Sequence, residues 1–91
     1  MDHHQNPRKA KLIKRLKIIE GQIRGLQGMV EEGKYCVDII TQAIAVKKAI
    51  GSFEEEMLEN HLATHVVEQM KAGKEEKAVK EIMTIHKLSI K

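Results

Sequence analysis

The chain has 91 residues, of which 42% are hydrophobic and 32% are charged, and its formal net charge is +3. A chain of this length forms one domain at most and buries only about 60–65% of the surface that its unfolded form exposes. Trp is absent, and Phe53 and Tyr35 are the only Phe and Tyr residues. Because the large side chains that usually fill a core are nearly missing, we expect an oligomer that shares its core between chains. No apolar run reaches the roughly 18 residues of a membrane span, and no signal peptide is expected. A cytoplasmic protein is therefore predicted.

The first predicted element is a long helix that follows a polar tail. Residues 1–6 are polar and are expected to be flexible, and Asn6-Pro7 fits an N-cap followed by the first helical position. A helix over 7–31 is predicted because apolar residues recur at alternating steps of four and three, which is a heptad pattern. These residues are Leu12, Leu16, Ile19, Ile23, Leu26 and Val30.

The start of this helix is strongly basic. Six Lys and Arg residues and no acidic residue lie between Pro7 and Ile19. A basic helix face on an otherwise balanced protein is typical of nucleic-acid binding, although a face that is only solvated would have the same composition. Acidic residues are concentrated instead in the middle of the chain, at Glu54, Glu55, Glu56 and Glu59.

Two further helices are predicted, over about 34–70 and about 74–89. Gly33 ends the first helix and separates it from the second. Gly51-Ser52 is a soft point inside the second helix, and two small residues without a proline are expected to be tolerated there. No stretch alternates like a strand, so the predicted fold class is all-α, with three helices in a single domain.

The residues that can bind a metal are Cys36, the only cysteine, and five histidines. His61 and His65 stand at i and i+4, so on a helix both rings leave the same face one turn apart. Two imidazoles need this spacing to bind one ion. Leu62 stands where the HExxH motif of zinc hydrolases has its glutamate, which argues against that class. The spacing alone leaves open a small core role for Cys36 and a surface role for the histidines.

Cys36 precedes His61 by 25 residues on what is predicted to be one helix. A continuous helix would separate the two by roughly 37 Å, so they cannot bind the same ion within it. Either the helix folds back at Gly51-Ser52, or two chains pair antiparallel, so that Cys36 of one meets the histidines of the other. The heptad pattern and the thin core of a single chain favour the second arrangement, which predicts a two-fold dimer with two equivalent sites.

Two segments resemble the CsoR/RcnR family of copper-sensing and nickel/cobalt-sensing repressors. They are RLKIIEGQIRGLQGMVEEGKYCVDIITQ (15–42) and NHLATH (60–65), and the resemblance extends over nearly the whole chain. It implies a three-helix protomer, an antiparallel four-helix-bundle dimer and a tetramer made of two dimers. It also implies a repressor that binds operator DNA in the apo form and releases it when metal binds, and not an enzyme.

By position, the resemblance assigns the metal ligands to Cys36, His61 and His65. Many copper sensors have a second cysteine at the last of these positions, and the chain departs from them there. The nickel/cobalt sensors have histidine at that position and another near the N-terminus, which aligns best with His4, next to His3. This ligand set therefore resembles that of the nickel/cobalt sensors.

Tyr35 and Glu81 indicate copper. By the resemblance, they match residues of copper sensors that contact the metal ligands and link the metal site to the DNA-binding state. One thiolate with two imidazoles suits the soft Cu(I) ion, whereas Ni(II) and Co(II) take more ligands. The predicted metal is Cu(I), with Ni(II)/Co(II) or Zn(II) as alternatives. The aldehyde and sulfur sensors of the family resemble the chain less, since the sulfur sensors use two cysteines.

For DNA binding, the resemblance matches Arg15 to the key arginine of the family. Nearby lysines would add phosphate contacts rather than sequence readout: Lys9, Lys11, Lys14, Lys47 and Lys48. A cytosolic metal buffer that does not bind DNA is a rival, but a buffer does not need so basic a helix. An enzyme is not predicted, because the chain has neither a carboxylate pair with a base nor a phosphate-binding loop.

Overall fold

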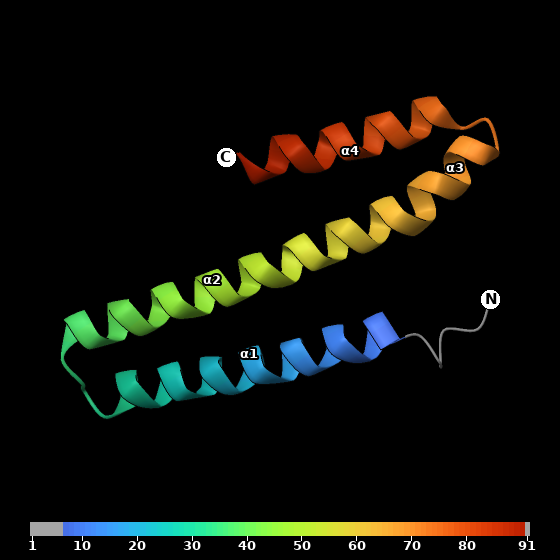
Figure 1. Cartoon of the computed structure of the whole chain (residues 1–91). Coiled ribbons are helices and arrows are strands. Elements are labelled where there is room, and N and C mark those ends of the chain that lie inside the picture. The colour runs from blue at the N-terminus through green and yellow to red at the C-terminus, as the bar shows by residue number, and fades with distance from the viewer. Residues whose placement is uncertain (1–6, 91) are drawn as a thin grey trace. The chain divides into compact units, whose positions relative to one another are not determined.

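The structure, a computed structural model, describes residues 7–90 (Figure 1). Its helices are α1 (Pro7–Glu31), α2 (Cys36–His61), the π-helix η1 (Leu62–Val66), α3 (Val67–Lys71) and α4 (Glu75–Ser89). No strand occurs among the described residues, and the predicted all-α class is confirmed. The predicted flexible tail at 1–6 lies outside the described residues.

The chain divides into two compact units, Met1–Met57 and Leu58–Lys91. In the first unit, α1 and α2 run antiparallel (Figure 1). The turn between them is a Schellman motif, because the Gly33 N–H donates to the Val30 carbonyl at 3.1 Å and the Lys34 N–H donates to the Met29 carbonyl at 3.0 Å. Gly33 has a φ of 66°, a left-handed conformation that glycine adopts without steric cost. This glycine therefore fixes where α1 ends.

The second unit repeats this turn chemistry between α3 and α4. Gly73 has a φ of 74°, and the Lys74 N–H donates to the Gln69 carbonyl at 2.7 Å. The turn reverses the chain, so that α4 packs back against α3 (Figure 1). This packing brings Glu81 of α4 within hydrogen-bond distance of Gln69 of α3.

Gly51 and Ser52 lie inside α2 without interrupting it. The alternative in which the second helix folds back at these residues is therefore wrong. A single Gly-Ser pair costs about 1 kcal/mol of helix propensity relative to alanine, and the flanking residues of α2 are good enough helix formers to sustain the helix through it. Cys36 and the histidines cannot meet within one chain by this route.

The stretch predicted as one helix over about 34–70 contains a π-helical segment, η1. The Thr64 hydroxyl donates to the Asn60 carbonyl, four residues earlier, at 2.7 Å. Such side-chain bonds compete with the backbone bonds of an α-helix, and a β-branched residue adds crowding in the turn. The wider turn is a local feature that hydrophobic periodicity does not reveal. π-segments of this kind are frequent at functional sites.

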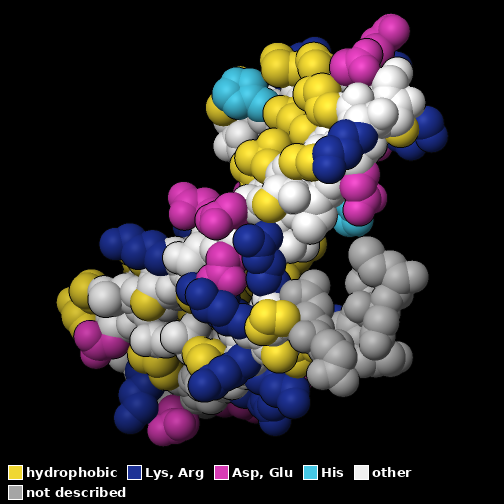
Figure 2. Space-filling view, turned by 45° about the vertical axis from the view of Figure 1, so that its right-hand side comes forward, with side chains coloured by type: hydrophobic (Ala, Val, Ile, Leu, Met, Phe, Trp, Pro, Cys, Tyr) yellow, Lys and Arg dark blue, Asp and Glu magenta, His cyan; other side chains and the backbone are white. Residues whose placement is uncertain are grey.

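The described chain buries few hydrophobic side chains. Within the described residues, the buried hydrophobic side chains are Ile19, Val46, Val66 and Ala78. Large apolar side chains lie instead at the surface of both units, where Figure 2 shows them in yellow. They include much of the predicted heptad pattern and the apolar face of α2: Leu16, Ile23, Val30, Val37, Ile40, Ile44, Ile50 and Met57. These side chains are exposed in the single chain.

Candidate metal centre and DNA-binding residues

His61 and His65 form a pair in the second unit. Their Nδ1 atoms lie 3.4 Å apart, and their ring centroids are separated by 5.4 Å with the rings tilted by 57°. His61 is the last residue of α2, and His65 lies in η1. Two nitrogen atoms at this separation can both bind one ion at about 2.0 Å. The predicted i, i+4 pair is thus brought together with the geometry of a bidentate donor.

The other ring nitrogen of His61 is buried. Its Nε2 atom makes no hydrogen bond within the described residues, and a buried ring nitrogen without a partner costs free energy. Histidine ligands generally donate this second N–H to a carboxylate or carbonyl group, which orients the ring. His61 thus presents Nδ1 towards His65, while its Nε2 lacks a hydrogen-bond partner in the described chain.

Glu81 of α4 is a carboxylate near the histidine pair. The Gln69 side-chain amide donates to the Glu81 carboxylate (Oε1) at 2.9 Å. This hydrogen bond lowers the pKa of Glu81, and the charges of Lys77, His61 and His65 lower it further. The ionised form of Glu81 is therefore favoured by the Gln69 hydrogen bond and by the positive charge of its neighbours. Gln69 was not singled out by sequence reasoning, because a glutamine on a helix gives no signal of what it contacts.

Replacing Gln69 with leucine is expected to raise the pKa of Glu81, because the carboxylate loses its hydrogen-bond donor. The lowered pKa stabilises the folded protein at neutral pH, and this stabilisation is lost as the pH falls through the folded-state pKa. The side-chain carboxyl shift of Glu81, followed by NMR between pH 2 and 7, measures the change. Thr84→Val, which removes only the bond from this hydroxyl to the Lys80 carbonyl, should leave the Glu81 titration as in the unaltered protein.

Cys36 and Tyr35 lie at the start of α2, in the first unit. Cys36 is a free, exposed cysteine, and Tyr35 is exposed while its carbonyl accepts from the N–H groups of Asp38 and Ile39. Among residues 7–90, no three His, Cys, Asp or Glu side chains come together as a metal site. Of the predicted ligands, the single chain brings together His61 and His65, and Cys36 does not join them in a group of three. His3 and His4 lie outside the described residues.

The predicted DNA-binding residues divide into exposed lysines and a paired arginine. The exposed lysines are Lys9, Lys11 and Lys14 on α1, with Lys47 and Lys48 on α2. Arg15 is half-buried, and its Nε atom lies 2.6 Å from Oε1 of Glu56. Sequence reasoning placed Glu56 only in an acidic cluster, since the contact between α1 and α2 cannot be read from a charge pattern.

Comparison with known proteins decides which class of protein has these features. The family model described as "Metal-sensitive transcriptional repressor" matches residues 8–87. The chain belongs to this family. Its members are transcriptional repressors and not enzymes, and a transcriptional repressor binds DNA. The basic helix α1 and the histidine pair therefore lie in a chain of a metal-sensing repressor family.

Two similar relatives are named as copper-sensing repressors. The chain is 39% identical over 87 residues to the copper-sensing transcriptional repressor CsoR of Bacillus subtilis (strain 168), covering 96% of this chain and 86% of the relative. It is 39% identical over 71 residues to the copper-sensing transcriptional repressor RicR of Mycobacterium tuberculosis (strain ATCC 25618 / H37Rv), covering 78% of this chain and 74% of the relative.

A solved structure has the same fold. The crystal structure of the copper-sensing repressor CsoR with Cu(I) from Geobacillus thermodenitrificans NG80-2 superposes with a TM-score of 0.91 at 35% identity, covering 100% of this chain and 95% of that chain. The described chain therefore has the three-helix fold of a copper-sensing repressor. Within residues 7–90, no helix is both long and apolar enough to span a membrane.

Proposed function

We propose that this repressor senses Cu(I): it binds operator DNA in the apo form and releases the DNA when Cu(I) binds to Cys36, His61 and His65. The observation that carries this proposal is the 3.4 Å separation of the two histidine Nδ1 atoms, in a chain whose relatives are copper-sensing repressors. One thiolate and two imidazoles are donors that suit the soft Cu(I) ion. The site of action of such a repressor is the cytoplasm.

The thiol comes from a second chain in this proposal. Cys36 is exposed at the start of an uninterrupted α2, and the apolar side chains of α1 and α2 are exposed in a single protomer. An antiparallel pair of protomers buries these side chains and brings Cys36 of one chain to the histidines of the other. The two-fold symmetry gives two equivalent sites per dimer, and two such dimers form the proposed tetramer.

Tyr35 and Glu81 complete the proposed site. Glu81 is the carboxylate that lies near the histidine pair in the same unit, and it is suited to accept the Nε2–H of His61, whose Nε2 lacks a partner in the described chain. Tyr35 precedes Cys36 and arrives with it from the second protomer. In this way the ligands and the residues behind them join two chains through one ion.

DNA release then follows from linkage between two binding equilibria. A ligand that favours one arrangement of the protomers weakens whatever requires another arrangement, and by the same factor in both directions. Neutralisation of charge does not explain release, since an added cation would strengthen the attraction between a basic protein and DNA. Arg15, with Lys9, Lys11, Lys14, Lys47 and Lys48, is proposed to contact phosphates in the apo arrangement.

A titration of the apo protein on its operator under anaerobic conditions tests the choice of metal. Cu(I) is expected to release the DNA at one equivalent per protomer, and Ni(II), Co(II) and Zn(II) are expected to have no comparable effect. Fluorescence anisotropy of labelled operator DNA follows release, and absorption spectroscopy reports the coordination number. Release by Ni(II) or Co(II) in a six-coordinate complex, without release by Cu(I), would assign the protein to nickel/cobalt sensing and would bring His3 and His4 into the site.

A further inference from the structure

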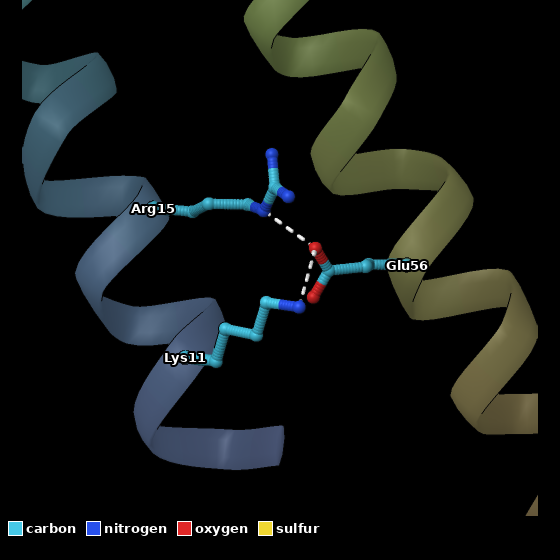
Figure 3. Close-up of polar contacts among 3 residues, drawn as sticks. All are labelled: Lys11, Arg15 and Glu56. Carbon is cyan, nitrogen blue, oxygen red and sulfur yellow. Dashed lines mark ion pairs between the residues drawn. The ribbon is translucent and has the colours of Figure 1, made fainter. Parts of the chain in front are cut away.

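One acidic residue faces the basic helix from α2. Figure 3 shows Glu56 pointing towards Lys11 and Arg15, which stand one turn apart on α1. The Oε1 atom of Glu56 lies 2.6 Å from Nε of Arg15 and 3.8 Å from Nζ of Lys11. All three residues belong to the first unit. A single carboxylate oxygen thus neutralises part of the charge of two cations that are proposed to contact DNA.

The Arg15–Glu56 contact is a close charge pair without an aligned hydrogen bond. The Nε atom of Arg15 and the Oε1 atom of Glu56 are both buried atoms without a hydrogen bond in the described chain, although they are in ion-pair contact. The closest contact of the Arg15 guanidinium with Glu56 is made through Nε. Since the strongest arginine contacts are bidentate, this pair uses only part of what the guanidinium offers.

In the single chain, the three side chains are partly exposed to solvent although the contacting atoms of Arg15 and Glu56 are buried. The side chain of Lys11 is 66% exposed, that of Arg15 is 38% exposed and that of Glu56 is 23% exposed. A carboxylate and a phosphate present the same kind of anionic oxygen to arginine. A DNA phosphate that approaches Arg15 therefore meets a site in which an anion of the protein is already bound.

We propose that Glu56 is an internal competitor of DNA phosphate for Arg15 and Lys11, and that it holds the operator affinity of the apo repressor below the value that the two cations alone would give. This inference rests on the proposed contact of Arg15 with DNA. A DNA phosphate interacts with the full positive charge of Arg15 and Lys11 only when the Glu56 carboxylate is displaced. Glu56 thereby makes the repressor–DNA complex easier to release.

The substitution Glu56→Gln tests the proposal because it removes the charge and preserves the shape of the side chain. Each protein chain that contacts DNA then offers about one more positive charge to it. For each such chain, the plot of log affinity against log salt concentration becomes steeper by about 0.9. Operator affinity is expected to rise by about 10-fold at 50 mM salt and by about 3-fold at 200 mM salt. Fluorescence anisotropy of the metal-free protein at four or more salt concentrations measures both quantities.

Three matched variants separate competition from a simple change of net charge. Glu55→Gln removes the same charge from the neighbouring, exposed residue of α2, and it should change affinity much less. Glu56→Asp keeps the charge and should keep the salt dependence of the unaltered protein. In an Arg15→Ala, Lys11→Ala background the gain from Glu56→Gln should disappear, as a double-mutant cycle requires.

The outcomes distinguish this inference from the function on which it rests. Equal gains from Glu55→Gln and Glu56→Gln, or weaker binding by Glu56→Gln, would overturn the competitor role, and weaker binding would show that Glu56 supports the DNA-binding conformation. If Glu56→Gln has no effect while Arg15→Ala loses affinity, the competitor role fails and the DNA contact stands. If Arg15→Ala itself leaves binding unchanged, the proposed DNA contact fails as well.

Discussion

Replacing Cys36 with alanine is expected to abolish the copper response and to leave operator binding by the apo protein within about twofold of the unaltered protein. Cys36 is the only thiol in the chain, so no other side chain can supply a thiolate. Loss of a residue that only supports a ligand typically costs 10- to 100-fold in metal affinity, and loss of the thiolate itself is expected to cost more than about 100-fold. DNA should therefore remain bound at Cu(I) concentrations that release it from the unaltered protein.

The alanine variant isolates the chemistry of the thiol from the fold. Cys36 is exposed in the protomer, and alanine is the best helix former, so helix α2 should still begin at this position. Operator release is measured by anisotropy during an anaerobic Cu(I) titration, with circular dichroism as the check of helix content. Release that is unchanged in Cys36→Ala would exclude the proposed site, and lost DNA binding in the apo variant would assign Cys36 a structural role.

Mixing two inactive variants tests whether the site is shared between chains. Cys36→Ala alone and His61→Ala alone each lack a ligand in every site. In a heterodimer of the two, one site lacks both ligands, while the other combines the intact Cys36 of one chain with the intact His61 of its partner. Co-refolded mixtures should therefore recover tight Cu(I) binding in about half of the sites of each heterodimer. No recovery would place all the ligands within one chain.

The second large effect is expected for Arg15→Ala, which should weaken operator binding by the apo protein about 10- to 100-fold, the range of a lost charge-assisted hydrogen bond. The loss has two physical sources. A phosphate contact disappears, and Glu56 keeps its negative charge with only Lys11 nearby, at 3.8 Å. The salt dependence should become shallower by about 0.9 for each contacting copy. Cu(I) affinity should change little, since Arg15 is not among the proposed ligands.

Arg24→Ala is the matched control for this loss. Arg24 lies on the same helix α1, is 73% exposed and pairs with Glu20 at 3.5 Å. An exposed i, i+4 pair contributes only about 0.3–0.5 kcal/mol, so the fold should not change. Equal losses of DNA affinity in Arg15→Ala and Arg24→Ala would show that α1 attracts DNA only through its total charge. A loss confined to Arg15→Ala would support a specific phosphate contact.

The fold class and part of the site were predictable because their signals are local. Apolar residues spaced by three and four indicate helices, and Gly33 adopts the positive φ that ends α1. The i, i+4 spacing of His61 and His65 predicted the pair that the structure contains. The resemblance to metal-sensing repressors was confirmed by the family match. The metal-binding and DNA-binding roles of all the named residues stay predictions, those of the histidine pair, Glu81 and Arg15 included.

Sequence by itself thus determined the helices, the histidine pair and the class of protein, since each depends on residues close together in the chain or on similarity along it. The tertiary structure decided what depends on long-range contact or local geometry: the π-turn at Thr64, the hydrogen bond from Gln69 to Glu81, and the pairing of Arg15 with Glu56. A charge pattern shows how many cations a helix carries. Only packing of one helix against another shows which of them already holds an anion.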